Sequence, residues 1–480
     1  MKTYLIPFLL LSLFASCNME PTPDALSITF DPAVLNFEYS AKSDTVQIDM
    51  NGEYWEVTSN VTWCTVSKKI SMKQKDSLVV TVSSNTGTMA RTAILIFNVG
   101  NGKLKDTLVV NQNIRTYNYP KYGDSIASNM TGMNSSAMEI AQKIKVGWNA
   151  GNTLEATGGE TAWGNPMIND GLIKLVKQSG FQAIRLPCSW DQYANQSTAK
   201  ISESWLNRVK QVVQYCVDNQ MYVILNIHWD GGWLENNCTT SKKDENNAKQ
   251  RAFWQQIATK MRDFDEHLMF ASANEPNVTN SAQMSVLMSY HQTFIDAVRS
   301  TGGKNAYRVL VVQGPSTDIA TTNNLMTQWP TDRVANKLMA EIHYYTPWNF
   351  CGMSTDETWG KMSYYWGKDF HSTTDLTRNC TWGEEATVIE NFGLMKKKFV
   401  DKGIPVVMGE FGAIRRSNLT GDALALHLAS RAYFFEYCTK TAISNGLLPF
   451  FWDTGELLDR KTNSVLDQQA LNGLIQGSTE

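Results

Sequence analysis

This sequence of 480 residues lacks several features that mark large classes of protein. Charge of one sign is not in excess, because 43 Lys and Arg stand against 46 Asp and Glu, and the net charge of -3 gives no reason to expect a nucleic-acid partner. The eight cysteines show no paired CxxC spacing, so no zinc site is indicated. No GxGxxG follows the first strand expected in the main domain, which argues against a dinucleotide-binding sheet.

The N-terminal apolar run, Leu5 to Phe14, is too short to cross a bilayer as a helix and has the size of a signal peptide's apolar core. It ends in Leu13-Phe-Ala-Ser-Cys17, which resembles a bacterial lipobox of the Bacteroidetes type, with Cys17 as the lipidated first residue. The alternative is an ordinary cleaved signal peptide with an incidental cysteine. Either case predicts an exported protein in which disulfides are permitted, although the other seven cysteines do not reveal a pairing.

We therefore expect a lipoprotein signal peptide over residues 1–17 and a polar tether over 18–25. The predicted location is the outer membrane, at the cell surface or the periplasmic face, with the lipid as the only membrane contact. We expect the protein to be a monomer.

Residues 26–114 form short alternating runs rich in Val, Thr, Ser and Asn, separated by turn-forming pairs such as Asn51-Gly52 and Asn101-Gly102. This pattern predicts a small all-β, immunoglobulin-like sandwich. The strands are expected at 27–30, 44–49, 54–57, 77–82, 92–97 and 105–110.

Details of this segment resemble the BACON domain. The matching residues are Trp55, Trp63-Cys64, Ser83-Ser-Asn85, Arg91-Thr-Ala and Val109-Val-Asn-Gln112. The family name suggests carbohydrate binding, but the positions of Trp55 and Trp63 favour core packing. A spacer is the plainer role, and residues 115–134 are expected to be a linker.

Residues 135–480 alternate apolar runs of strand length with longer amphipathic segments such as 171–179 and 205–219. Eight such units predict an α/β fold, a (β/α)8 TIM barrel, rather than a doubly wound sheet. The strands are expected at 145–148, 183–186, 222–227, 268–271, 308–312, 338–342, 406–408 and 447–451.

A TIM barrel places its chemistry at the C-terminal ends of the strands, and polar residues stand at most of these ends. Glu275, followed by Pro276, and Glu410, followed by a glycine at 412, each end an apolar strand. Two carboxylates at strand ends are what glycoside hydrolysis needs, one to protonate the leaving oxygen and one to attack or to activate water. The other polar or aromatic residues at strand ends are Asn149, Asn152, Arg185, His228, Asn274, His343, Tyr345 and Trp452.

Eight stretches of this domain resemble glycoside hydrolase family 5, the cellulase-type retaining glycosidases. In chain order they are Gly147-Trp-Asn-Ala-Gly-Asn152-Thr-Leu-Glu155, Glu160-Thr-Ala-Trp-Gly-Asn-Pro166, Ile184-Arg185-Leu-Pro187, Asn226-Ile-His228-Trp-Asp230, Asn274-Glu275-Pro276, His343-Tyr-Tyr345, Gly409-Glu410-Phe-Gly412 and Phe451-Trp452-Asp453.

The resemblance implies a role for each matching residue. Glu275 is expected to be the general acid/base, with its pKa raised by an enclosed site and a second carboxylate, and Glu410 the nucleophile, kept ionised by Arg185 and Tyr345. Further expectations are Asn274 on the sugar's 2-hydroxyl, His228 and His343 as orienting groups, and Asn152 and Trp452 against the sugar. This chemistry needs no metal or cofactor.

One position departs from the family's commonest pattern, because Trp229 stands where many relatives carry a second His after the one matched by His228. Trp229 joins Trp163, Trp233 and Trp348 as a candidate sugar-stacking surface, with loop anchoring as the alternative.

The predicted activity is endo-acting cleavage of β-1,4-glucan backbones of plant cell walls, cellulose-like, mixed-linkage or xyloglucan. A mannanase or xylanase of the same family is the alternative, and a catalytically inactive glycan-binding lipoprotein is a further one.

Overall fold

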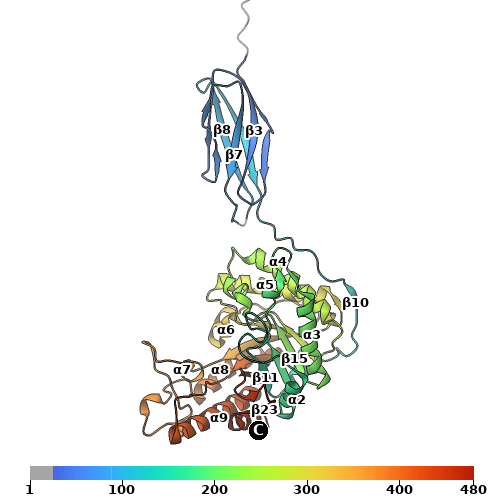
Figure 1. Cartoon of the computed structure of the whole chain (residues 1–480), viewed down its shortest axis with the longest axis vertical. Coiled ribbons are helices and arrows are strands. Elements are labelled where there is room, and N and C mark those ends of the chain that lie inside the picture. The colour runs from blue at the N-terminus through green and yellow to red at the C-terminus, as the bar shows by residue number, and fades with distance from the viewer. Residues whose placement is uncertain (1–24, 88, 480) are drawn as a thin grey trace, which may run out of the picture. The chain divides into compact units, whose positions relative to one another are not determined.

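The computed structural model describes residues 25–87 and 89–479, so the expected signal peptide and Cys17 lie outside the described residues. The chain divides into two compact units, Met1–Thr116 and Tyr117–Glu480 (Figure 1). Each unit has its own hydrophobic core. The boundary confirms a small N-terminal β unit ahead of a larger unit in which strands and helices alternate.

The N-terminal unit is a β-sandwich. One sheet has the strand order β1-β3-β7-β5 and the other β2-β9-β8-β4-β6. Six strands coincide with the predicted ones, and β2, β5 and β6 are additional. The bounds are β1 Ser27–Asp31, β2 Val34–Phe37, β3 Lys42–Asn51, β4 Trp55–Ser59, β5 Cys64–Val66, β6 Ile70–Ser71, β7 Lys75–Val82, β8 Arg91–Val99 and β9 Leu104–Gln112.

The two sandwich tryptophans have different surroundings. Trp55 is fully buried, and its ring centroid lies 5.5 Å from that of Phe97 in the sandwich core. Trp63 packs at the edge of the core, and the Arg91 guanidinium lies 4.2 Å from its ring centroid. Neither ring is free on both faces, so both contribute to packing as the sequence suggested.

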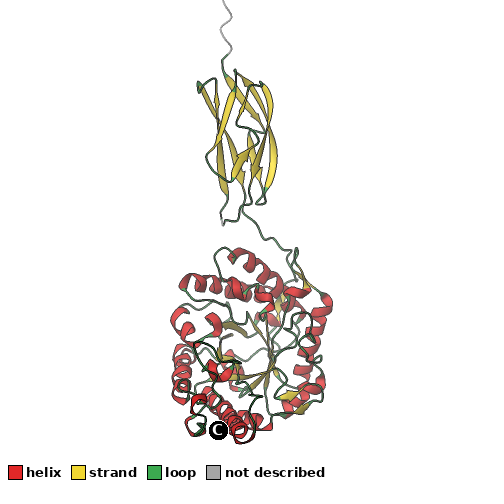
Figure 2. Ribbon diagram, turned by 60° about the vertical axis from the view of Figure 1, so that its left-hand side comes forward, coloured by secondary structure: helices red, strands yellow, loops and turns green. Residues whose placement is uncertain are grey.

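The second unit is a closed barrel of eight parallel strands surrounded by helices (Figure 2). The first and last strands pair with each other, with Gly147 opposite Phe450 and Asn149 opposite Trp452. This confirms the predicted TIM barrel. The strands are β11 Gly147–Ala150, β12 Ala183–Leu186, β15 Tyr222–Asn226, β16 Leu268–Ala271, β18 Leu310–Gln313, β19 Leu338–Tyr344, β20 Val406–Phe411 and β21 Leu447–Asp453.

Helices lie between the barrel strands, and several carry the sequence signals of a helix start. In α1, Ser136 and Glu139 form a capping box, in which each side chain accepts the other residue's backbone N–H. The helices are α1 Ala137–Gln142, α2 Asp170–Gln178, α3 Glu203–Asp218, α4 Lys243–Lys260, α5 Ser281–Ser300, α6 Ile319–Leu325, α7 Trp348–Cys351, α8 Glu385–Lys398, α9 Gly421–Ser444 and α10 Gln468–Thr479.

The segment expected to be a linker, residues 115–134, lies mostly in the barrel unit. The Tyr122 hydroxyl donates to the Thr198 carbonyl at 2.8 Å. Strand β10 (Ile126–Ser128) pairs with β17 (Gly302–Gly303), and Met133 is fully buried. Aromatic and apolar side chains in this stretch therefore anchor it to the barrel.

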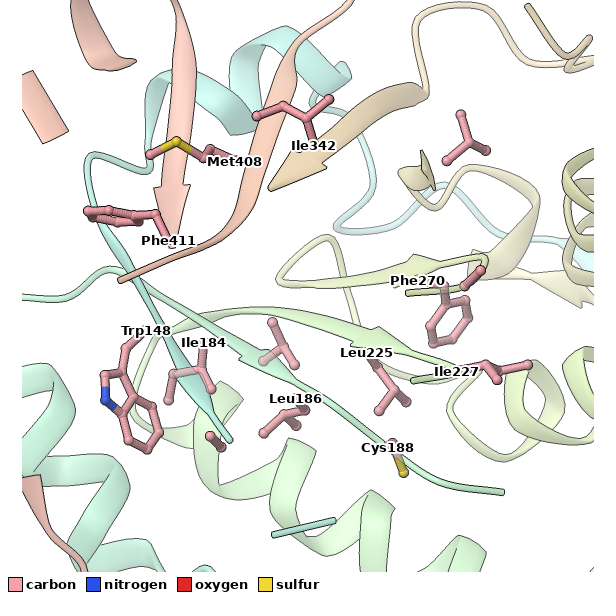
Figure 3. Close-up of a cluster of buried hydrophobic side chains, with 14 of the residues drawn as sticks. Trp148, Ile184, Leu186, Cys188, Leu225, Ile227, Phe270, Ile342, Met408 and Phe411 are labelled. Carbon is pink, nitrogen blue, oxygen red and sulfur yellow. The ribbon is translucent and has the colours of Figure 1, made fainter. Parts of the chain in front are cut away.

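Strand residues alternate between two hydrophobic layers. Trp148, Ile184, Leu225 and Ile342 point outward and pack in the layer beneath the helices (Figure 3). Their neighbours on the same strands point into the barrel, where Ile224, Met269, Met339 and Phe450 are among the residues that fill its interior. The alternation decides which polar residues face the barrel axis.

Among the described residues, no helix combines the length and apolar character needed to cross a membrane. The seven cysteines in the described part of the chain are free and buried.

Candidate active site

The polar centre of the barrel follows from strand alternation. Ile184 and Leu186 pack outward (Figure 3), so Arg185 between them points inward, and its side chain is fully buried. In the same way Ile342 points outward and its neighbours Glu341 and His343 point inward. Several strands thereby converge their charged side chains on one point.

Glu410 lies on β20 and is 6 % exposed. Arg185 Nη1 donates to its Oε1 at 2.8 Å, and the Tyr345 hydroxyl donates to its Oε2 at 3.0 Å. Arg185 also donates to Asn149 Oδ1 at 3.1 Å and to Asn274 Oδ1 at 2.8 Å. These contacts hold the carboxylate of Glu410 in one orientation, as a nucleophile requires.

Glu275 follows β16 and faces Glu410 across His343. His343 Nδ1 lies 2.7 Å from Glu275 Oε1 and 3.7 Å from Glu410 Oε2. Oxygen atoms of the two carboxyl groups and a ring nitrogen of His343 all lie within 4.8 Å of one another. A separation of about 5 Å between the two carboxyl groups is that of retaining glycosidases, because an inverting enzyme needs more room for a water.

The charges of this centre are strongly coupled. The carboxylates of Glu410, Glu275 and Glu341 raise the pKa of His343 to about 10, although burial alone would lower it. Burial raises the pKa of Glu410, and the charge of Glu275 adds to this effect. His343, Arg185 and Tyr345 lower the pKa, but by less, so the net shift is upward. His343 is therefore an imidazolium between two carboxyl groups.

The pKa of Glu275 departs from the sequence-based expectation. Burial raises it, but the hydrogen bond and charge of His343 outweigh burial, and the net shift in the free protein is downward. The Glu275 side chain is still 40 % exposed, unlike that of Glu410 at 8 %. Exclusion of water raises the pKa of a carboxyl group, so a ligand that covered Glu275 would shift its pKa upward.

The remaining predicted residues lie around this pair. The ring of His228 is parallel to that of Trp452, with centroids 5.7 Å apart, and burial holds its pKa well below the usual range, so this imidazole is neutral. Asn152 has a left-handed backbone, with φ of 57°. Its amide N–H and that of Thr153 donate to the buried carboxylate of Glu155.

The candidate stacking tryptophans differ in exposure. Trp163, Trp229 and Trp348 are between 43 % and 49 % exposed. Trp348 stands edge-on to Tyr345, with ring centroids 6.4 Å apart, and so lies beside the catalytic pair. Trp233 instead donates its Nε1 hydrogen to Asp230, and Lys249 lies over its ring, so it anchors its loop.

Two carboxyl groups near the centre were missed in the sequence. Glu341 stands inside an otherwise apolar strand, a signal that could have found it. Glu235 gives no such signal, because it lies in a short 3-10 helix (Glu235–Asn237) outside the barrel strands. Burial raises the pKa of Glu235 to about 8, and the charge of Glu275 adds to the shift.

Glu275, His343 and Glu410 also form a set of possible metal ligands that sequence spacing could not reveal. We assign no metal to them, because His343 Nδ1 and Nε2 contact carboxylate oxygens at 2.7 Å and 3.3 Å, an arrangement that an imidazolium makes without a metal. A histidine that binds a metal must be neutral, and the raised pKa of His343 opposes this.

Comparison with known proteins agrees with this geometry. Residues 148–456 match the family described as cellulase (glycosyl hydrolase family 5), and residues 53–113 match the BACON family. A xyloglucan-specific endo-β-1,4-glucanase of Bacteroides ovatus is 33 % identical over 98 % of this chain and 95 % of its own length. Endoglucanase A of Paenibacillus barcinonensis is 36 % identical over 71 % of this chain and 90 % of its own length.

Solved structures give the same result. A Bacteroides ovatus family 5 xyloglucanase in complex with a XXXG heptasaccharide superimposes with a TM-score of 0.70 and 31 % identity, covering 95 % of this chain and 100 % of that one. A family 5 xyloglucanase from Paenibacillus pabuli superimposes with a TM-score of 0.65 and 35 % identity, covering 71 % of this chain and 100 % of that one. The chain therefore belongs to glycoside hydrolase family 5, a family of retaining glycosidases, and carries a BACON domain ahead of its barrel.

Proposed function

We propose that this protein hydrolyses the β-1,4-glucan backbone of plant cell-wall polysaccharides at internal bonds, with retention of configuration, and that xyloglucan is its preferred substrate. The observation that carries the activity is the pair Glu275 and Glu410, which share one imidazolium and lie close enough for a double displacement. Glu410 attacks the anomeric carbon while Glu275 protonates the leaving oxygen. Glu275 then takes a proton from the water that hydrolyses the glycosyl-enzyme.

The preference for xyloglucan rests on two observations. The relatives similar over almost the whole chain bear names that state xyloglucan as their substrate. A cavity of about 500 Å³ opens beside the two carboxyl groups, with Trp348, Trp452 and Glu456 in its lining. This cavity provides room next to the cleaved bond for a glucosyl unit and a branch attached to the backbone.

Hydrolysis of a polysaccharide panel tests the proposal. Wild type, Glu275→Ala and Glu410→Ala are incubated with xyloglucan, barley β-glucan, carboxymethyl cellulose, glucomannan and xylan, and products are sized by chromatography. We expect wild type to release oligosaccharides fastest from xyloglucan and both variants to lose activity. Azide added to Glu410→Ala gives a glycosyl azide of inverted configuration if Glu410 is the nucleophile.

Other outcomes identify the alternatives. Fastest release from glucomannan or xylan makes the protein a mannanase or a xylanase. A wild type that binds a polymer and releases nothing is a glycan receptor, and the catalytic proposal then fails.

We also propose that the protein is exported and held at the outer membrane by a lipid on Cys17, and that it acts as a monomer. The support is the sequence Leu13-Phe-Ala-Ser-Cys17. Metabolic labelling with a fatty acid tests the anchor, with Cys17→Ala as the unlabelled variant. Loss of label together with release from the membrane fraction is the expected result.

A further inference from the structure

A third carboxylate, Glu341, lies beneath the catalytic pair, two residues before His343 on β19, and is fully buried. Its Oε1 lies 2.9 Å from Arg185 Nε and 3.3 Å from His343 Nε2. Its Oε2 accepts a hydrogen bond from Gln313 Nε2 at 2.5 Å. Glu341 thus contacts both cations that hold Glu275 and Glu410, Arg185 and His343. None of the roles described above has been assigned to Glu341.

The neighbouring strand is shaped to fit this side chain. A Cβ atom added to Gly409 would lie 2.1 Å from Glu341 Oε1, closer than any side chain could be accommodated. Gly409 directly precedes the nucleophile, so β20 has no side chain where Glu341 reaches toward Arg185. The site therefore contains both the buried charge and the space that it requires.

We propose that Glu341 is a positioning residue that keeps His343 doubly protonated, so that the Nδ1–H of His343 serves Glu275 and Glu410, and that keeps Arg185 in place against the nucleophile. The inference deepens the proposed function and rests on it. Glu341 acts only through His343 and Arg185.

The charge balance of the centre supports this role. Arg185 and an imidazolium at His343 supply two positive charges, and Glu275, Glu341 and Glu410 supply three carboxyl groups. The centre is neutral when one carboxyl group is protonated, which is the state that a general acid and an ionised nucleophile require. Without Glu341, His343 has no anion at Nε2. Glu275 and Glu410 remain at Nδ1, but the buried imidazolium loses part of its stabilisation, so the pKa of His343 falls below its value of about 10.

The contact with Arg185 is mainly electrostatic. Among the described residues Arg185 Nε makes no aligned hydrogen bond, although Glu341 Oε1 is 2.9 Å away. The hydrogen bond of Glu341 to a cation is instead the one with His343 Nε2. The protonation of His343 is therefore the property that should respond to a change at Glu341. The other titratable groups that face this centre are Glu275, Glu410, Tyr345, His228 and Glu235.

The test is the isosteric substitution Glu341→Gln in the full chain. We measure kcat/KM on xyloglucan from about pH 6 to about pH 10, because the pKa of His343 is about 10 in the intact centre and lower without Glu341. At the acid end His343 is protonated in both proteins, and toward the alkaline end the variant loses the proton first. We expect the ratio of wild-type to variant kcat/KM to rise about fivefold or more across this range, as one pKa unit of lost support implies.

A second readout follows His343 without turnover. The chain has six histidines, so ring-labelled protein gives few signals, and His343→Gln identifies the one in question. In wild type the His343 ring should lose its imidazolium signal only near pH 10. In Glu341→Gln it should lose this signal about one pH unit lower or more. A His343 signal that titrates at the same pH in the variant as in wild type overturns the proposal.

A matched control separates positioning from packing. Asp332 forms a similarly buried ion pair with Arg299, 2.6 Å apart with side chains 4 % and 2 % exposed, and neither residue belongs to the active site. Asp332→Asn should lower stability while its kcat/KM ratio stays flat with pH. A flat ratio in Glu341→Gln as well would show that Glu341 is only structural.

If Glu341→Gln does not fold, Glu341→Asp serves as the test. The shorter side chain withdraws the carboxylate from His343 Nε2, so the ratio must again rise with pH, and a flat ratio refutes the inference. Failure of the proposed function is recognised separately, because wild type would then hydrolyse no glucan at any pH.

Discussion

The substitution Tyr345→Phe removes one hydroxyl from the nucleophile and leaves the ring in place. That hydroxyl donates to Glu410 Oε2 at 3.0 Å, while the Tyr345 ring stands edge-on to Trp348. A hydrogen bond to a charged group contributes about 1.5–3 kcal/mol, and each 1.36 kcal/mol corresponds to one pKa unit or tenfold in rate. We therefore expect kcat/KM to fall about 10- to 100-fold.

The same change has a defined sign in the pH profile. The Tyr345 hydrogen bond lowers the pKa of Glu410. Removing it raises that pKa further, and because Glu410 attacks only when ionised, the acid limb of kcat/KM moves to higher pH, by about one to two units. The limb that reports Glu275 should move less, because the Tyr345 hydroxyl donates to Glu410.

The assay is xyloglucan hydrolysis by wild type, Tyr345→Phe and the neighbouring Tyr344→Phe. Tyr344, the last residue of β19, is fully buried but packs in the outer layer, so removing its hydroxyl should leave the profile unchanged. An acid limb of Tyr345→Phe that coincides with that of wild type would refute the role given to this hydroxyl. A shift of similar size in Tyr344→Phe would show that the effect is not specific.

Three further predictions concern packing and metal dependence. Gly409→Ala should lower kcat/KM by about 100-fold or more with little change in circular dichroism, because the new Cβ displaces Glu341 and the strand that carries Glu410; activity near wild type would contradict this. Trp55→Ala should destabilise the sandwich by about 3–5 kcal/mol in calorimetry while hydrolysis of soluble xyloglucan stays within about twofold of wild type. Prolonged dialysis against EDTA should leave kcat/KM unchanged, since both ring nitrogens of His343 contact carboxylates; loss of activity that a divalent ion restores would disprove this.

The barrel could be predicted from sequence because its strands are buried on both faces and read as unbroken apolar runs. Leu268 to Ala271 and Ala183 to Leu186 match the observed strands residue for residue. The short sandwich strands β2, β5 and β6 were missed, because two to four residues carry too little alternation to be recognised. The segment 115–134 was taken for a linker because its few apolar residues show no period.

Most residues of the active site could be predicted from the sequence, but their pKa shifts could not. Polar residues such as Glu275 and Glu410 can be recognised as candidates because they stand at the ends of barrel strands. Glu341 could not be recognised in this way. A role for this carboxylate follows only from its contacts with Arg185 and His343, which form when the barrel closes. The downward pKa shift of Glu275 likewise depends on the 2.7 Å approach of His343, a distance that no spacing in the sequence encodes.

The pairing of the first barrel strand with the last also governs how the enzyme can fail. The Asn149 side chain donates to the carbonyl groups of Gly409, Phe450 and Phe451, so strand β20, which carries the nucleophile, is tied to the first and last strands of the barrel. Until β21 is in place, β11 offers an unpaired edge, the kind of surface on which chains aggregate. A single proteolytic cut between Glu410 and Trp452 that released the last strand should therefore yield an insoluble chain rather than a slower enzyme.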